Sequence, residues 1–286
     1  KKGRWGKTFV DTRDWVEYNE ELVVRGEFLL ETTWVGNWDN ELAAMNKGKR
    51  GKPFEYPESL IRLQGVWHQW LDYRGIEGIT RKMEEHDIVP LHNDFSTINR
   101  RVNALDIGFT LPRSGTVSVS ADGTGMKLEN GGEHRAKLYG KKKRRYVKVN
   151  ITANPLTKSL LDCEVSIEGE GPSEPEFAKQ SMETMIGHGL NIGKFWGDGS
   201  YDDTTLFGFL EANGIEPAIK PRKNAVLSGG NTLRDKEITE RNRLGYKKWA
   251  RKRKYGRRWP GTEGILSDVK RKYCECIRAH TIENAL

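Results

Sequence analysis

The sequence predicts an α/β protein, in which a mixed sheet flanked by helices follows a mostly helical N-terminal region. In the first part of the chain, apolar side chains recur at helical spacing, as in Leu60, Leu63 and Trp67. From residue 112 onward, short stretches of alternating apolar and polar residues separated by turns replace that pattern. We therefore expect a helical region over residues 1–111 and an α/β domain over residues 112–286.

The helices expected in the N-terminal region are bounded by recognisable end signals. One covers "YPESLIRLQGVWHQWLDY" (residues 56–73) and begins near Pro57, where a helix tolerates proline. The next runs to about Asp87 and breaks at Val89-Pro90. A further helix begins near Ser96, with either Ser96 or Asp94 as its N-cap.

Polar and basic residues open that last helix, away from its apolar stripe. Two short helices joined in this way resemble a helix-turn-helix, in which the second helix reads DNA. Plain packing of a helical hairpin explains the same pattern equally well. The residues that would contact DNA are Thr97, Asn99, Arg100 and Arg101.

The second part of the chain reads as three strands, a helix, a strand, a helix, a strand and then further helices. The strands are "TVSVSAD", "YVKVNITANP", "SLLDCEVSIEG", "KFWGD" and "EPAIKPR", and the closing helices are broken at "RRWPGT". This order suits a mixed sheet covered by helices, as in ribonuclease H-like folds.

Two aspartates stand where strands of this sheet are expected to end. Asp122 and Asp198 each follow a strand and precede a glycine. Parallel pairing of the two strands would make the acids neighbours, and adjacent carboxylates favour a cation between them. Asp202 and Asp203 are better explained as cap and first-turn acids of the next helix, with Asp202 as the alternative to Asp198.

A third acid, Glu263, opens a C-terminal helix. Lys270 lies seven residues further on and therefore nearly on the same helix face. A surface acid that favours the helix dipole is the alternative explanation for Glu263, and a solvated lysine is the alternative for Lys270.

The net charge of +8 is concentrated in two stretches. Residues 134–148 hold eight Lys and Arg and residues 241–258 hold ten, neither contains an acid, and the rest of the chain therefore carries −10. Aromatic residues within both runs favour nucleic acid over membrane as the partner. No stretch approaches 18 uncharged apolar residues, no signal peptide is recognisable, and three cysteines suit reduced thiols of the cytoplasm.

Taken together, these motifs resemble those of the DDE-type insertion-sequence transposases of the group that includes insertion sequences four and five. The matching segments are "DGTGMK" at Asp122, "DGSYDD" at Asp198 and the block that carries Tyr255, Arg258, Glu263 and Lys270. "YRGIEGITRKM" and "STINRR" also resemble the helical N-terminal region of these proteins. The family pattern places three residues between its Arg and Glu, whereas four lie between Arg258 and Glu263.

The resemblance implies a catalytic and metal-binding triad of Asp122, Asp198 and Glu263, which would hold two Mg²⁺ or Mn²⁺ ions. It further implies cleavage at the ends of an insertion sequence and joining of the 3′-OH to target DNA. Tyr255, Arg258 and Lys270 would support catalysis or contact phosphate. The expected partners are double-stranded DNA, as terminal inverted repeats and target, and a second protomer in a homodimer, within a prokaryotic cytoplasm at the nucleoid.

The basic runs would follow DNA backbones. Their expected contacts are Lys141, Lys142, Lys143, Arg144, Arg145, Arg241, Lys247, Lys248, Arg251 and Arg253. Three alternatives remain: a ribonuclease H-like nuclease that only hydrolyses, a transposase-derived DNA-binding protein without catalysis, and a structural nucleic-acid-coating protein.

Overall fold

A computed structural model describes most of the chain, and contacts between residues divide it into two units. The described residues are 14–108, 111–127, 146–167 and 169–273, with 275 and 277. The first unit comprises residues 1–107 and the second residues 108–286. No helix in these described ranges combines the length and the apolar character that crossing a bilayer requires.

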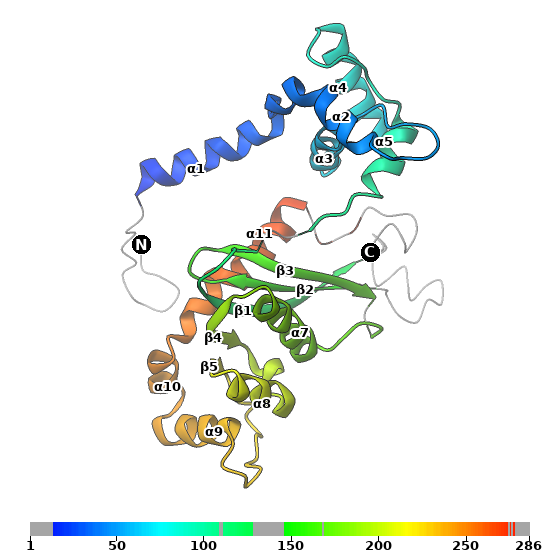
Figure 1. The fold of residues 1–286 in the computed structure, drawn as a ribbon. Helices are drawn as coiled ribbons and strands as arrows, with labels where there is room; N and C mark the ends of the chain where they lie inside the picture. Colours follow the sequence, from blue (N-terminus) through cyan, green and yellow to red (C-terminus); the bar gives the residue numbers. More distant parts are fainter. Residues whose placement is uncertain are drawn as a thin grey trace, which may run out of the picture. The chain divides into compact units, whose positions relative to one another are not determined.

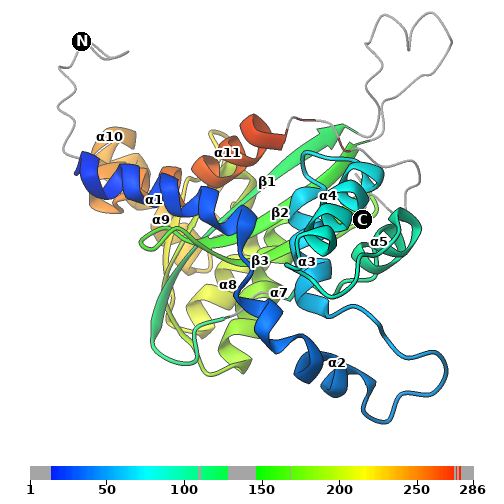
Figure 2. The same ribbon diagram turned by 90° about the horizontal axis from the view of Figure 1, so that it is seen from above.

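The first unit is helical, and α3, α4 and α5 group together in it (Figures 1 and 2). Its core contains the fully buried side chains Leu60, Ile76 and Ile98. Its elements are α1 (Trp15–Glu27), η1 (Phe28–Leu30), η2 (Thr33–Asn37), α2 (Trp38–Asn46), α3 (Glu58–Trp67), α4 (Tyr73–Glu85) and α5 (Phe95–Val102). The helix expected to reach residue 73 ends at Trp67, because Trp70 and Leu71 lie in a turn and are exposed.

Asp94 caps α5, one of the two caps that the sequence allowed. Its Oδ1 accepts hydrogen bonds from the backbone N–H groups of Ser96 and Thr97, at 2.9 and 3.0 Å. Residues 86–94 separate α4 from α5. That connection is longer than the three- or four-residue turn of a helix-turn-helix. The expected pair of helices is therefore present without the expected tight turn.

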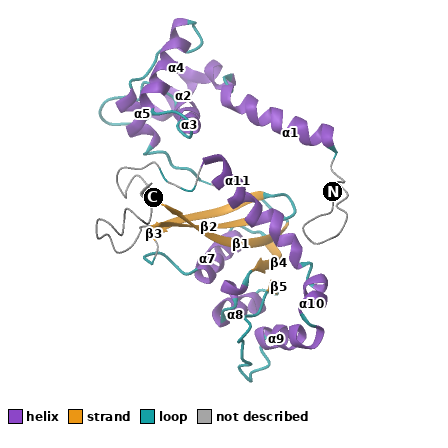
Figure 3. Ribbon diagram, turned by 180° about the vertical axis from the view of Figure 1, so that it is seen from behind, coloured by secondary structure: helices purple, strands orange, loops and turns teal. Residues whose placement is uncertain are grey.

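The second unit contains a five-stranded mixed sheet with the order β3-β2-β1-β4-β5 (Figure 3). Its strands are β1 (Thr116–Lys127), β2 (Tyr146–Asn154), β3 (Ser159–Ile167), β4 (Asn191–Gly197) and β5 (Glu216–Ile219). β2 pairs antiparallel with both β1 and β3, whereas β4 pairs parallel with β1 and β5. This is the mixed sheet of a ribonuclease H-like fold, as the sequence predicts.

Helices cover both faces of this sheet, with α7 on one side and α11 on the other (Figures 1 and 3). Val119 and Ala121 of β1 pack with Met182 of α7 and Phe207 of α8 in the larger core. The elements are α7 (Glu174–Gly187), η3 (Gly199–Tyr201), α8 (Thr204–Ala212), α9 (Leu233–Leu244), α10 (Tyr246–Lys252), η4 (Tyr255–Arg257), the π-helical turn η5 (Trp259–Glu263) and α11 (Gly264–Tyr273).

Two boundaries near the predicted acids differ from expectation. Asp122 does not end its strand, because residues 123–127 continue to pair with β2 as far as Lys127 opposite Tyr146. The helical break expected at "RRWPGT" is also absent, because the chain stays wound there as the π-helical turn η5. Asp198, in contrast, follows the last residue of β4 as predicted.

Candidate functional site

The expected parallel pairing places Asp122 and Asp198 on neighbouring strands. In the register between β1 and β4, Ser120 lies opposite Trp196. Extending that register by two residues brings Asp122 beside Asp198. Because side chains alternate between the faces of a strand, Asp122 points to the same face as Ser120, opposite to Val119 and Ala121.

Arg258 connects Asp122 to the third predicted acid. Its Nη1 lies 3.8 Å from Oδ2 of Asp122, and its Nη2 forms an ion pair with Oε1 of Glu263. The Arg258 side chain is 12% exposed, so solvent weakens these attractions less than at the surface. One guanidinium therefore draws together an acid of the central strand and an acid of the C-terminal region.

The π-helical turn explains how Arg258 and Glu263 meet across four intervening residues. A π-helix joins residue i to residue i+5, one more than an α-helix. Here the N–H of Gly264 donates to the carbonyl of Trp259, five residues earlier. The π-helical turn thus accommodates the one residue that this chain has in addition to the transposase pattern. Arg258 still contacts Glu263.

Gly261 holds this turn against the sheet. A Cβ at that position would lie 2.7 Å from the backbone Cα of Pro155 and 2.8 Å from Oγ of Ser120. Both distances are too short for a side-chain carbon, so only glycine permits the close approach. Ser120 lies on the same face of β1 as Asp122, and the contact therefore places the turn that carries Glu263 on the face that carries Asp122.

Burial raises the pKa of Asp122 to about 6. The Arg258 guanidinium and a hydrogen bond from the N–H of Gly123 oppose this shift, while the charges of Asp198 and Glu263 add to it. The three predicted acids therefore interact electrostatically. A cation placed among them would favour the ionised form of Asp122.

Tyr255 and Lys270 lie on the elements that surround these acids. Burial raises the pKa of Tyr255 to about 12, so its hydroxyl keeps its proton at neutral pH. Its ring lies 5.6 Å from the Arg258 guanidinium. Lys270 is half-buried on α11. Tyr255 is thus a hydrogen-bond donor at neutral pH and an unsuitable nucleophile.

The sequence did not reveal a fourth acid, Glu174, at the start of α7. Its Oε2 accepts a hydrogen bond from Oγ of Ser200 at 2.5 Å, and its Oε1 lies 3.3 Å from Nζ of Lys148. Ser200 Oγ is also 2.6 Å from Oδ1 of Asp198. In the structure Ser173 is the N-cap of α7 and Glu174 is an acid of its first turn, and neither feature indicates proximity to Asp198.

Two buried polar atoms near these acids have no hydrogen-bond partner among the described residues. They are Oδ1 of Asn150 and the hydroxyl of Tyr201, both on fully buried side chains. Burial, followed by the charges of Glu174, Asp122 and Asp198, raises the pKa of Tyr201 well above its usual value. Buried groups of this kind normally have partners, so these two indicate a place for a polar ligand.

The residues present suit a divalent cation in chemistry and in charge. All the candidate donors are oxygen atoms, which Mg²⁺ and Mn²⁺ prefer. A Cβ on Gly123 would lie 2.8 Å from Oδ1 of Asn150 and 3.0 Å from Oε1 of Glu174, so only glycine lets these two oxygen atoms approach β1 so closely. Across the described ranges, however, no three Asp, Glu, His or Cys side chains already lie in a metal-binding arrangement.

The two other aspartates of "DGSYDD" have structural partners. Asp203 caps α8, as expected, through a hydrogen bond from the N–H of Leu206 at 2.9 Å. Asp202 is neither the N-cap nor a first-turn acid of α8. Its carboxylate pairs with Nε of Arg234 at 2.7 Å and accepts the N–H of Arg222 at 2.8 Å. Asp202 therefore joins distant segments and is a weak alternative to Asp198.

The predicted DNA-binding residues of the C-terminal run differ in exposure. Lys247, Lys248 and Arg251 are exposed on α10, and Arg241 is half-buried on α9. Arg253 departs from the prediction, because its guanidinium bonds to Glu237, Glu240 and Glu216 and its side chain is only 17% exposed. The residues of the first run, Lys141, Lys142, Lys143, Arg144 and Arg145, lie outside the described residues.

The predicted DNA-binding residues of α5 also differ in exposure and in their contacts within the protein. Arg100 is exposed, whereas Asn99 is half-buried. The Thr97 hydroxyl donates to Oδ2 of Asp94 at 2.8 Å. The Arg101 guanidinium lies 4.4 Å from the ring centre of Phe54. Arg100 is therefore the best placed of the four to meet a phosphate.

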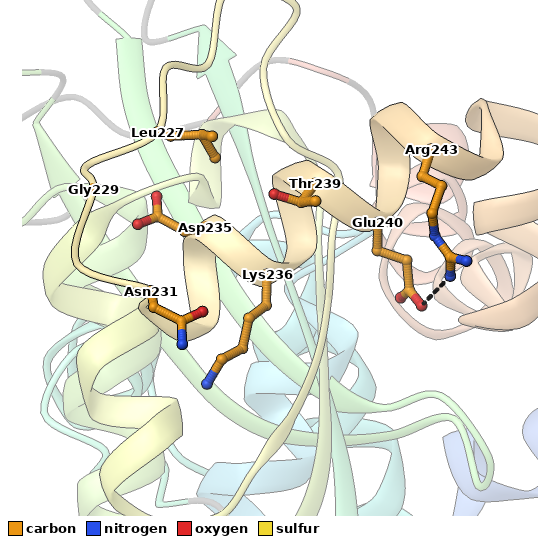
Figure 4. A pocket seen from close by; sticks show the side chains of 8 residues that line it. All are labelled: Leu227, Gly229, Asn231, Asp235, Lys236, Thr239, Glu240 and Arg243. Carbon is orange, nitrogen blue, oxygen red and sulfur yellow. Dashed lines mark ion pairs between the residues drawn. The ribbon is translucent and has the colours of Figure 1, made fainter.

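A shallow depression lies along α9 and the loop that precedes it (Figure 4). Asp235, Lys236, Glu240 and Arg243 line it, and the last two form an ion pair at 4.0 Å. None of the predicted catalytic acids lines this depression. It is therefore separate from the candidate site.

The chain matches known proteins in both of its units. Residues 113–281 match a protein family described as "Transposase DDE domain", and residues 23–131 match a second family with the same description. The crystal structure of the Mos1 strand transfer complex is similar at 9% sequence identity and a TM-score of 0.27, over 93% of this chain and 89% of that one. The first family match spans more than half of the chain, and the protein thus belongs to the DDE transposase family.

Proposed function

We propose that this protein is a DNA transposase of the group that includes insertion sequences four and five. It cuts phosphodiesters at the ends of an insertion sequence and joins the freed 3′-OH to target DNA. Asp122, Asp198 and Glu263 are its catalytic, metal-binding acids. The observation that carries the proposal is the parallel pairing of β1 with β4, which makes Asp122 and Asp198 neighbours, together with Arg258, which contacts both Asp122 and Glu263.

The three carboxylates would hold two Mg²⁺ ions, with Mn²⁺ as a substitute. When bound, such ions increase the nucleophilicity of the attacking oxygen and stabilise the leaving oxygen in an in-line displacement at phosphorus. Tyr255 keeps its proton and can donate it in a hydrogen bond to a phosphate oxygen. Arg258 can bind phosphate in a bidentate manner, and Lys270 supplies a further positive charge on α11.

Exposed basic residues would follow the DNA backbone outside the site. Lys247, Lys248 and Arg251 on α10 are the contacts that their exposure supports best. Residues 1–111 would recognise the terminal inverted repeats or pair two protomers. Because two DNA ends require two active sites, we expect a homodimer on DNA, acting at the nucleoid of a prokaryotic cytoplasm.

The decisive experiment mixes the protein with Mg²⁺, labelled candidate element ends and a plasmid target, and then sequences the products. We expect both cut ends and joined ends, and neither product with Asp198→Asn. Cutting without joining, even from a pre-cut end, would instead identify a ribonuclease H-like nuclease. Specific DNA binding without cutting would identify a transposase-derived binding protein.

The role of α10 is tested separately by the salt dependence of DNA binding. Replacing Lys247, Lys248 and Arg251 by Gln should reduce the slope of log K against log salt concentration by about 3, because each lost phosphate contact removes about one unit. The matched control replaces three exposed lysines elsewhere by Gln: Lys47, Lys52 and Lys82. Equal slopes for the two triple variants would remove α10 from the DNA-binding surface.

A further inference from the structure

Glu174 belongs to the site although neither the sequence pattern nor the family motifs include it. It occupies the first position of α7, where the helix dipole favours a negative charge. Its side chain is 25% exposed and lies 3.3 Å from Lys148, which is 24% exposed. A carboxylate this far removed from solvent, paired to one lysine, has a restricted set of orientations.

Ser200 links Glu174 to Asp198. The Ser200 hydroxyl lies 2.5 Å from Oε2 of Glu174 and 2.6 Å from Oδ1 of Asp198. The backbone N–H of Ser200 also donates to Oδ1 of Asp198, at 2.7 Å. The hydroxyl has one hydrogen, which it can donate to only one of the two carboxylates at a time, whereas the backbone N–H of Ser200 always donates to Asp198. Within the described part of the chain, these contacts to the Asp198 carboxylate all involve Oδ1. Its orientation is therefore set by Ser200, with Oδ2 left for another partner.

We propose that Glu174 is a positioning residue for Asp198. A serine hydroxyl rotates freely unless a partner fixes it, and Glu174 is that partner. Glu174 fixes Ser200, and Ser200 fixes the plane of the Asp198 carboxylate. This inference rests on the proposed function, because it takes Asp198 as the metal-binding acid. Groups that orient a metal ligand typically change metal affinity by 10- to 100-fold when removed.

A purely structural role for Glu174 predicts different behaviour. If Glu174 served only to neutralise Lys148, any acid at position 174 would suffice, and Ser200 would be dispensable. Glu174→Asp separates these roles, because it keeps the charge near Lys148 but shortens the reach to Ser200. Ser200→Ala removes the hydroxyl link and leaves the Glu174–Lys148 pair intact.

The test measures Mn²⁺ binding by calorimetry to the full chain, alongside its melting temperature. We expect Glu174→Gln, Glu174→Asp and Ser200→Ala each to weaken Mn²⁺ binding by about 10-fold. The double variant Glu174→Gln/Ser200→Ala should bind no more weakly than either single variant, because both break the same link. Glu176→Gln is the matched control, since Glu176 is an exposed acid in the same helical turn.

Three results would overturn the proposal. Unchanged Mn²⁺ affinity in Glu174→Gln would remove Glu174 from the site. A large loss in Glu174→Gln with none in Ser200→Ala would make Glu174 a direct ligand. A loss of affinity that only accompanies a lower melting temperature would make its role structural. Wild-type protein that binds Mn²⁺ but cuts no DNA would refute the proposed function alone, whereas wild-type protein that binds no Mn²⁺ would refute both.

Discussion

Two arginines five positions apart, Arg253 and Arg258, each lie among carboxylates, but their clusters differ in charge balance. In the Arg253 cluster, three carboxylates face four basic groups: Glu216, Glu237 and Glu240 with Lys194, Arg243, Lys252 and Arg253. The described residues near Arg258 form a second group, in which Arg258 pairs with Asp122 and Glu263, Lys148 pairs with Glu174, and Asp198 shares Ser200 with Glu174. We call these four carboxylates and two basic groups the Arg258 cluster.

This difference separates a structural network from a binding site. The Trp249 indole N–H completes the Arg253 cluster by donating to Glu237 at 3.2 Å. Among the described residues, the Arg258 cluster instead retains two unmatched negative charges when all its acids are ionised, and the Tyr201 hydroxyl has no hydrogen-bond partner there either. Removing one partner from a cluster whose carboxylates are all matched destabilises the fold, whereas a cluster with excess negative charge favours binding of a cation.

The largest expected effect is at Asp122, where function and stability should move in opposite directions. Asp122→Asn should lower DNA cleavage by at least about 10³-fold, because it removes a proposed metal ligand. The same change should stabilise the protein at pH 7 by about 1 kcal/mol, because the raised pKa means that ionised Asp122 opposes folding. Cleavage assays and urea unfolding measure the two effects.

The pH dependence of that stabilisation follows from the sign of the pKa shift. The folded pKa of about 6 lies above the unfolded value, so Asp122 contributes stability at low pH that is lost as the pH rises from about 4 to about 6. The advantage of Asp122→Asn should therefore grow across this window and stay constant above it. An advantage that shrinks as the pH rises would contradict the assignment.

The next prediction compares the loss of stability when the same substitution, Arg to Met, is made at each of the two arginines. Arg253→Met should destabilise the protein by about 3–5 kcal/mol, because it leaves Glu237, which is 1% exposed, without its charged partner. Arg258→Met should cost about 1 kcal/mol, because Asp122 can take up a proton instead. Urea unfolding at pH 7 compares the two variants.

A rescue experiment controls for packing at Arg253. Glu237→Gln combined with Arg253→Met should recover part of the lost stability, since the uncompensated charge is gone. The two arginine side chains have similar exposed fractions, 17% and 12%. Equal losses of stability in the two single variants would therefore show that the clusters do not differ as proposed.

A smaller effect is expected where the π-helical turn meets the sheet. Gly261→Ala should destabilise the protein by about 1–3 kcal/mol, because its Cβ would overlap the backbone of Pro155. Cleavage should fall as well, since Glu263 would be displaced. Gly256→Ala is the control, because a Cβ there meets nothing within 4 Å. Thermal unfolding should show no loss for the control.

The smallest effect concerns a fully hydrogen-bonded carboxylate in the first unit. Asp94→Ala should cost about 1 kcal/mol through loss of the α5 cap, and Asp94→Asn much less. Hydrogen bonds from Ser96 and Thr97 lower the pKa of Asp94, so its contribution is present above the unfolded pKa and is lost as the pH falls. Urea unfolding at pH 7 and pH 3 checks both statements, and equal costs for the two variants would contradict them.

Local patterns were sufficient to predict the sheet and two strand-linked acids. Alternation of apolar and polar residues in "TVSVSAD" identified β1. Asp198 follows an apolar strand, and this position predicted that it would lie next to Asp122 if the two strands paired in parallel, as β1 and β4 do. The length of β1 could not be predicted, because the pairing of its last residues depends on β2. The partners of Asp202 lie 20 and 32 residues away, so its role was equally hidden from local patterns.

The remaining parts of the candidate site depend on tertiary contacts. Pro260-Gly261 reads as a helix break, yet packing of Gly261 on Pro155 keeps the chain wound. Glu174 is separated from Asp198 by a whole helix and strand, and the Ser200 hydroxyl lies within hydrogen-bond distance of both. No spacing rule connects residues brought together in this way.

The π-helical turn also bears on how the chain tolerates changes in length. Inserting one residue into an α-helix rotates everything beyond it by about 100° relative to what precedes it. Because the added residue is confined to one wide turn, α11 is not rotated about its axis, and its side chains face the same neighbours as they would without the added residue. The segment between Arg258 and Glu263 can therefore be one residue longer while α11 keeps its orientation.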